Sequence, residues 1–184
     1  MIDYYKIALS IDFYKSKGFT RIESPWTVTE KINRITAPPN SPVWTISNKD
    51  KVLVASGEQS FLYLYLKDFL PKGSFQTTTP CFRDEPFDQT HTKYFIKNEL
   101  IKTDIVNDSE LQNVVDTAMD FFARISKSFD SDAETTCIKT DLGYDILING
   151  IEVGSYGIRQ CEYLKWIYGT GCSEPRLSMS LLNK

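Results

Sequence analysis

The residues best suited to chemistry lie within the stretch 79–99, which contains an arginine, several acids, one histidine and aromatic residues. Arg83 follows a β-prone run, and Phe95 lies near the start of a second one, beyond a polar loop. Two such runs predict a hairpin, and a long loop carried by strands is often functional. An arginine binds phosphate or carboxylate through two hydrogen bonds, and an aromatic ring packs on a planar group. The stretch therefore indicates a site for an anion that carries a planar ring.

The order of these residues resembles motif 2 of the class II aminoacyl-tRNA synthetases. The matching residues are Phe82, Arg83, Glu85, His91 in the loop, Phe95 and Glu99. The spacing of His91 and Phe95 also fits the aspartyl-type version of the motif. A surface hairpin with an incidental arginine is the alternative for this pattern taken alone. The other two motifs of the family therefore decide between the two interpretations.

The segment 3–25 resembles motif 1, which forms the dimer interface in the family. Apolar residues recur at three- and four-residue spacing over 3–17, which predicts an amphipathic helix that ends at Gly18. The run 19–25 then predicts a strand that Pro25 closes. The resemblance implies a homodimer.

The stretch from Gly169 to Arg176 resembles motif 3, whose pattern is G-x-G-x-G-x-x-R. Ser173 stands in place of the third glycine, and Pro175 precedes the arginine. Serine is a good N-cap and proline is tolerated in a first helical turn, so we expect a helix over 174–183 with Arg176 near its positive end. With three motifs in order, the sequence is identified as similar to the class II catalytic core over nearly its whole length.

Two further acids and an arginine fit the same family. Ser56-Gly57-Glu58 begins a predicted helix at 58–69 and resembles the segment that holds the α-ammonium group of the amino acid. An acid at a helix start is also favourable on the helix dipole alone. Glu152 and Arg159 have the spacing E-x-G-x-x-x-I-R, which in aspartyl-type relatives supplies a magnesium ligand and a substrate-binding arginine.

The resemblance implies a role for each of these residues. Those implied for ATP are Arg83, Glu85, His91, Phe95, Glu99, Glu152 and Arg176. Those implied for the amino acid are Glu58, Arg83, Ser155 and Arg159. Glu99 and Glu152 are the implied ligands of Mg²⁺, a hard cation that prefers oxygen. Arg83 and Arg176 are the implied catalytic residues.

The identity of the amino acid depends on Arg159. An arginine in a closed pocket needs an anion or a strong acceptor, which favours a substrate such as aspartate or asparagine, with Glu58 on the opposite wall. A protein acid such as Glu162 is an alternative partner for Arg159. The segments Ser56–Glu58 and Thr79–Arg83 also resemble the seryl-type enzymes, so both substrate classes stay open.

The remaining elements complete an α+β fold, in which the resemblance implies an antiparallel sheet flanked by helices. Residues 108–128 are the longest stretch with apolar residues at helical spacing, which predicts a helix. Asn149-Gly150 predicts a hairpin turn after a strand at 143–148. Short strands are predicted at 43–47 and 52–55, and a loop at 128–136. We expect one catalytic domain over 1–184 and no anticodon-binding domain.

Composition narrows the class of protein. The 184 residues carry a net charge of −3, which argues against a broad nucleic-acid surface. Four scattered cysteines and one histidine do not form a zinc pattern, and they fit a reducing, cytoplasmic compartment. No run of residues has the length and apolarity of a membrane span or a signal peptide.

The leading hypothesis is therefore a ligase that uses ATP and Mg²⁺ to convert an amino acid to an aminoacyl-adenylate, with transfer to tRNA or another acceptor. The alternative is a non-catalytic paralogue that senses an amino acid or binds a partner through an inherited pocket.

Overall fold

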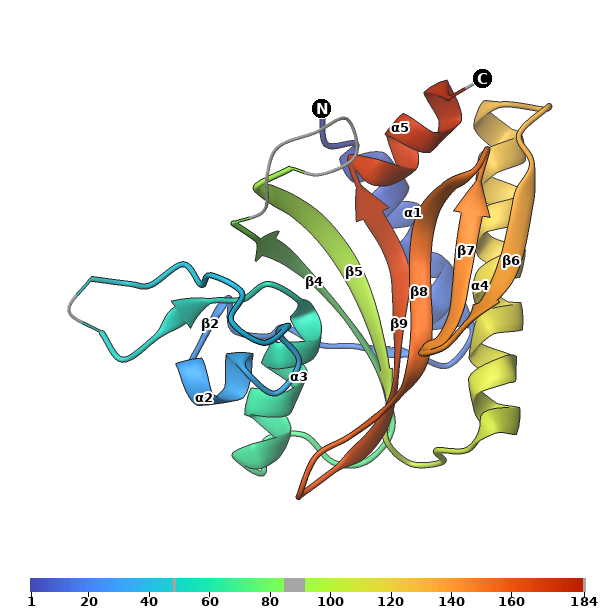
Figure 1. Cartoon of the computed structure of the whole chain (residues 1–184). Helices are drawn as coiled ribbons and strands as arrows, with labels where there is room; N and C mark the ends of the chain where they lie inside the picture. Colours follow the sequence, from blue (N-terminus) through green and yellow to red (C-terminus); the bar gives the residue numbers. More distant parts are fainter. Residues whose placement is uncertain (48, 85–91, 184) are drawn as a thin grey trace.

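The computed structural model describes residues 1–47, 49–84 and 92–183, and its centre is a seven-stranded sheet (Figure 1). In sheet order the strands are β1 (Thr20–Arg21), β4 (Ser74–Phe82), β5 (Tyr94–Lys102), β9 (Lys165–Glu174), β8 (Ile151–Gln160), β7 (Gly143–Ile148) and β6 (Thr135–Thr140). Neighbouring strands are antiparallel except for β1 and β4, which are parallel. The predicted α+β architecture is confirmed, with one parallel pair at an edge.

Two long helices cover one face of this sheet (Figure 1). They are α1 (Tyr4–Ser16) and α4 (Asp108–Phe129). The side chain of Asn107 caps α4 by accepting a hydrogen bond from the backbone N–H of Glu110 at 2.8 Å. The apolar face of α4 then packs into the main core with Tyr14 and Leu100. The predicted helices at 3–17 and 108–128 are thus confirmed within the ordinary uncertainty of helix ends.

A smaller unit lies on the opposite face. It consists of α2 (Glu30–Asn33), α3 (Gly57–Leu66) and a two-stranded sheet of β2 (Thr27–Val28) and β3 (Val52–Leu53). Its core includes Ile101 and Trp166, whose neighbours Leu100 and Ile167 face the helices on the other side. This alternation along β5 and β9 leaves both faces of the sheet covered. No helix in the described ranges is long and apolar enough to cross a membrane.

Several expected elements differ from the structure. The strand predicted at 19–25 is only Thr20–Arg21, and 43–47 forms no named strand, only an isolated bridge from Thr45 to Val52. The predicted loop at 128–136 overlaps the end of α4 and the start of β6, because β6 gains its hydrogen bonds from β7.

The junction between β9 and α5 (Arg176–Leu182) also corrects an expectation. Ser173 is not an N-cap, because β9 stays paired with β5 as far as Glu174. Pro175 occupies the cap position and makes no side-chain hydrogen bond, so the helix begins at Arg176 itself. The hairpin at Asn149-Gly150 is confirmed, with φ of 49° and 79° between β7 and β8.

Candidate active site

A pocket of about 410 Å³ lies between the sheet, α3 and the segment 33–43. It brings together all the predicted site residues that the structure describes, which are Glu58, Arg83, Phe95, Glu99, Glu152, Ser155, Arg159 and Arg176. Glu85 and His91 lie outside the described residues. Positions from 58 to 176 in the sequence therefore face one common space, as the family resemblance implies.

Strand β5 provides one wall because alternate residues of a strand point to the same face. Phe95, Lys97 and Glu99 all line the pocket. Arg83 lies beside Phe95, with its guanidinium carbon 5.0 Å from the centre of the ring. Its Nε donates to the carbonyl oxygen of Ala55 at 3.2 Å, which fixes the Arg83 side chain against the segment that leads into α3.

Glu99 is the most enclosed acid on this wall, with 1% of its surface exposed. The Oγ of Ser56 lies 2.8 Å from each carboxylate oxygen, and Nζ of Lys97 is 2.8 Å from Oε1. Burial alone would raise the pKa of Glu99, but the charge and hydrogen bond of Lys97 and the hydroxyl of Ser56 lower the pKa below its ordinary value. Glu99 is therefore ionised at neutral pH.

The N-terminus of α3 fits closely against Glu99. A Cβ atom at Gly57 would lie 3.2 Å from Oε2 of Glu99 and 3.1 Å from the hydroxyl of Thr79. The absence of a side chain at Gly57 thus lets the first turn of α3 approach the sheet. The partial positive charge of a helix N-terminus adds to the stabilisation of the Glu99 carboxylate.

Glu58 forms a second buried ion pair beside the first. Its Oε2 contacts Nη1 of Arg159, and its Oε1 accepts a hydrogen bond from Nε1 of Trp166 at 2.5 Å. Burial raises the pKa of Glu58 to about 7; Arg159 opposes this shift and the nearby Glu99 adds to it. The guanidinium of Arg159 also lies over the ring of Tyr168, 4.1 Å from its centre.

This contact corrects the expected placement of Arg159. The sequence predicts Arg159 and Glu58 on opposite walls, or Arg159 paired with Glu162, whereas in the structure Arg159 contacts Glu58. An acidic substrate is favoured only where the pocket arginine lacks a counter-charge of its own. Because Glu58 balances the charge of Arg159, the arginine no longer favours aspartate over an uncharged amino acid.

Glu152 and Arg176 form a third ion pair at a more open part of the pocket, with a distance of 3.3 Å between Oε1 and Nη1. The Glu152 side chain is 45% exposed, so this pair is weakly held. Glu152 can therefore turn to a cation that phosphate oxygens also bind, as Mg²⁺ sites commonly require. Of the two implied metal ligands, Glu152 is the more available to a cation, because Lys97 and Ser56 bind the oxygens of Glu99. Within the described ranges no three potential metal ligands gather.

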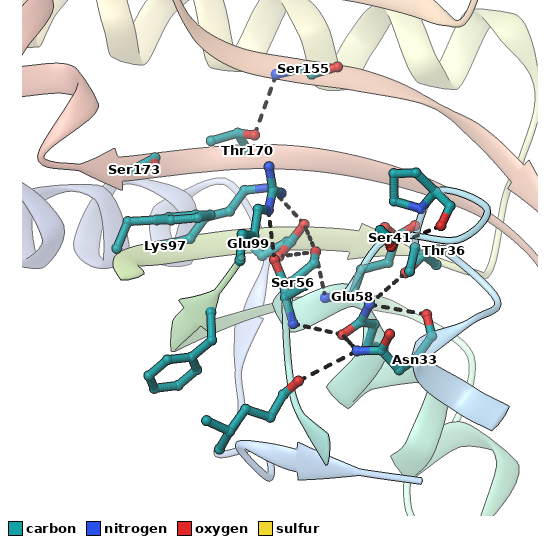
Figure 2. A pocket seen from close by; sticks show the side chains of 18 of the residues that line it. Asn33, Thr36, Ser41, Ser56, Glu58, Lys97, Glu99, Ser155, Thr170 and Ser173 are labelled. Atoms are coloured by element: carbon teal, nitrogen blue, oxygen red, sulfur yellow. Dashed lines mark hydrogen bonds and ion pairs between the residues drawn. The ribbon is translucent and has the colours of Figure 1, made fainter. Parts of the chain in front are cut away.

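Polar residues for which the sequence predicts no direct contact with a ligand also line the pocket (Figure 2). They are Asn33, Thr36, Ser41, Ser56, Lys97, Thr170 and Ser173. Lys97 was detectable, because it lies two residues from both Phe95 and Glu99 on a predicted strand. Thr170 and Ser173 lie on the same face of β9 because the pairing of β9 with β5 skips Gly171, which forms a β-bulge. The sequence did not predict this change of register.

Solved structures that share this architecture include aminoacyl-tRNA synthetases. Seryl-tRNA synthetase from Pyrococcus horikoshii complexed with ATP matches 96% of this chain with a TM-score of 0.70 and 15% identity, over 49% of its own chain. Pyrrolysyl-tRNA synthetase PylSc from Desulfitobacterium hafniense gives the same score and identity over 65% of its chain. Cytoplasmic serine-tRNA ligase from Naegleria fowleri in complex with AMP gives 0.68 and 16% over 52% of its chain.

Because the sequence identities are only 15–16%, these matches establish the fold alone. The chain has the fold of the class II synthetase catalytic core, as its motifs predict. It spans about half to two thirds of the length of these structures. No protein-family model matches the sequence, and no curated protein matches it by sequence.

Proposed function

We propose that this protein activates an amino acid with ATP to form an aminoacyl-adenylate and pyrophosphate, and transfers the aminoacyl group to tRNA or another acceptor. The observation that carries the proposal is that a single pocket holds Arg83, Phe95 and Arg176 beside the buried acids Glu58 and Glu99. The arginines and the aromatic ring suit the phosphates and the base of a nucleotide. The carboxylates suit the ammonium group of an amino acid. The occurrence of the same fold in a synthetase complexed with ATP supports the nucleotide assignment.

The nucleotide end of the site lies at Phe95 and the two arginines. The adenine ring stacks on Phe95, and Arg176 covers its other face and reaches the outer phosphates. Arg83 binds the α-phosphate and the carboxylate of the amino acid together, which brings the two reacting groups into contact. Fixed positive charges of this kind stabilise the charge that develops during phosphoryl transfer.

The amino acid end lies at the floor formed by Glu58, Ser155 and Arg159. Glu58 accepts a hydrogen bond from the α-ammonium group, and Arg159 and Ser155 face the side chain. An oxygen of the substrate carboxylate attacks the α-phosphorus, and a P–O bond to the β-phosphate breaks as pyrophosphate leaves. The new acyl–phosphate bond retains the energy needed for transfer.

Mg²⁺, the cofactor implied by the family resemblance, would be held by Glu152 and the phosphate oxygens of ATP. When bound, the ion neutralises phosphate charge. We further propose a homodimer formed through the segment 3–25. All four cysteines are free thiols, which supports a reducing compartment such as the cytoplasm.

Amino acid-dependent exchange of pyrophosphate into ATP tests the proposal directly. The twenty amino acids are assayed one at a time with the purified chain, and we expect exchange with one or a few of them. Absence of exchange with all twenty, in a protein that is folded, would refute adenylate formation.

The alternative function is amino acid sensing without catalysis. The observation that favours it is that the site's charges are already paired within the protein, as in Glu58–Arg159 and Glu152–Arg176. A chain that binds an amino acid by calorimetry but supports no exchange would favour this function.

A further inference from the structure

Lys97 is a cation on the β5 wall to which the proposed reaction assigns no role. Its side chain is 13% exposed and lines the pocket. An ammonium group has three N–H donors. Among the described residues, the ammonium of Lys97 donates to one partner, Oε1 of Glu99 at 2.8 Å. Lys97 is partly buried at the pocket wall, so its remaining N–H donors are available to an acceptor that enters the pocket.

The position of Lys97 along β5 identifies that acceptor. Phe95 and Glu99 lie two residues to either side of it on the same face, roughly 6–7 Å along the strand. In register, its neighbours on the flanking strands are Thr79 on β4 and Ser173 on β9. Lys97 therefore lies between the proposed base-stacking residue, Phe95, and the acids at the amino acid end. Figure 2 shows Lys97 beside Glu99.

The group that joins a nucleoside to an amino acid in an adenylate is the α-phosphate. It must lie between the base and the amino acid, which is the position of Lys97. We propose that Lys97 binds a nonbridging oxygen of the nucleotide α-phosphate and is a further catalytic residue. This inference rests on the proposed function.

The contact with Glu99 does not prevent this role. One N–H of Lys97 stays on Glu99, which aims the side chain, and another donates to the phosphate. The hydroxyl of Ser56 also binds the Glu99 carboxylate, so that carboxylate keeps a hydrogen bond even if the Lys97 ammonium moves slightly toward the phosphate. Two fixed cations, Arg83 and Lys97, then flank the same phosphate.

Binding of adenosine, AMP and ATP by calorimetry tests the assignment, since only the last two carry the α-phosphate. We expect Lys97→Met to weaken AMP and ATP binding at least about 10-fold and to leave adenosine binding within about 2-fold. Lys97→Arg should fall between the two. The matched control is Lys102→Met. Lys102 is a buried lysine of the same strand, 11% exposed and 3.0 Å from Asp104, and it does not line the pocket.

A double variant separates phosphate binding from a purely structural role. If Lys97 serves only to neutralise Glu99, Lys97→Met combined with Glu99→Gln restores AMP affinity. We expect AMP binding to stay weak in the double variant. Restored binding, equal AMP affinity in the wild type and Lys97→Met, or a wild type that binds AMP no more tightly than adenosine would each overturn the proposal.

The outcome is independent of the amino acid. If the wild type supports no exchange yet Lys97→Met selectively loses AMP, the phosphate contact stands and adenylate formation fails. If exchange occurs while AMP binding is insensitive to Lys97, adenylate formation stands and the Lys97 contact fails.

Discussion

Glu58 and Arg159, 101 positions apart in the sequence, form an ion pair at the floor of the pocket. Glu58 is almost fully buried, whereas the Arg159 side chain is 37% exposed. The indole N–H of Trp166 holds the other oxygen of Glu58. The carboxylate is thus fixed by two elements of the sheet, β8 and β9, although it belongs to α3.

Removal of Arg159 should leave Glu58 without its counter-charge. We expect Arg159→Leu to lower the free energy of unfolding by about 2 kcal/mol, less than for a fully buried pair because the arginine is partly solvated. The double variant with Glu58→Gln should recover most of this loss. Urea unfolding of the four proteins in the cycle provides the measurement, and additive losses would show that the pair is not coupled.

The raised pKa of Glu58 predicts a pH dependence of stability. Since its pKa is about 7 in the folded protein and 4.5 ordinarily, the folded state binds more protons between these values. Stability from this group is therefore complete below about pH 4.5 and is lost as pH rises through 7, by about 3 kcal/mol.

Glu58→Gln should remove that loss. Urea unfolding at pH 5 and pH 8 should give a smaller decrease for the variant than for the wild type. The pKa of Glu99 is lowered from its ordinary value of 4.5, so Glu99 stays ionised in both proteins between pH 5 and pH 8. Parallel pH profiles for the two proteins would contradict the assignment to Glu58.

Arg83 and Arg176 should be required for adenylate formation. We expect Arg83→Ala and Arg176→Ala each to reduce exchange at least about 100-fold, because each loses a charge-assisted contact to phosphate. Arg124→Ala is the matched control, since Arg124 is 72% exposed and pairs with Asp120 on the surface of α4. A folded Arg83 or Arg176 variant with wild-type exchange would rule out that arginine's role.

Glu152 and Glu99 should respond differently to magnesium. We expect EDTA to abolish exchange and Glu152→Gln to raise the Mg²⁺ concentration needed for half-maximal exchange about 10-fold. Glu99→Gln should leave that concentration unchanged even if it lowers the rate, because Lys97 and Ser56 already occupy its oxygens. A magnesium requirement shifted equally in both variants would show that Glu99 is a ligand after all.

The segment 3–25 should form the interface of a homodimer. We expect sedimentation velocity to give twice the 21.1 kDa of one chain at micromolar concentration. Arg21→Glu, on the exposed edge strand β1, should weaken association, because it removes the partner of Glu23 and places two acids on a surface that meets its own copy across a two-fold axis. Ile138→Lys, on the opposite edge strand β6, is the control. A wild type that sediments only as a monomer would contradict the prediction.

The sequence alone determined several local elements and most of the charged residues that line the site. Helical spacing gave α1 and α4, and Asn149-Gly150 gave the β7–β8 turn, because each depends on residues close together in the chain. The three motifs indicated the fold that solved synthetases share. They also indicated pocket residues from Glu58 to Arg176, because a motif records residue types that a common fold brings together.

Only the tertiary structure decided how those residues pair. The partner of Arg159 is Glu58 because β8 passes the N-terminus of α3, and no spacing within either segment specifies that approach. Ser173 stays in β9 rather than capping a helix because strand pairing with β5 satisfies its backbone. Ion pairs and register shifts depend on distances across the sheet, which the order of residues along one strand does not determine.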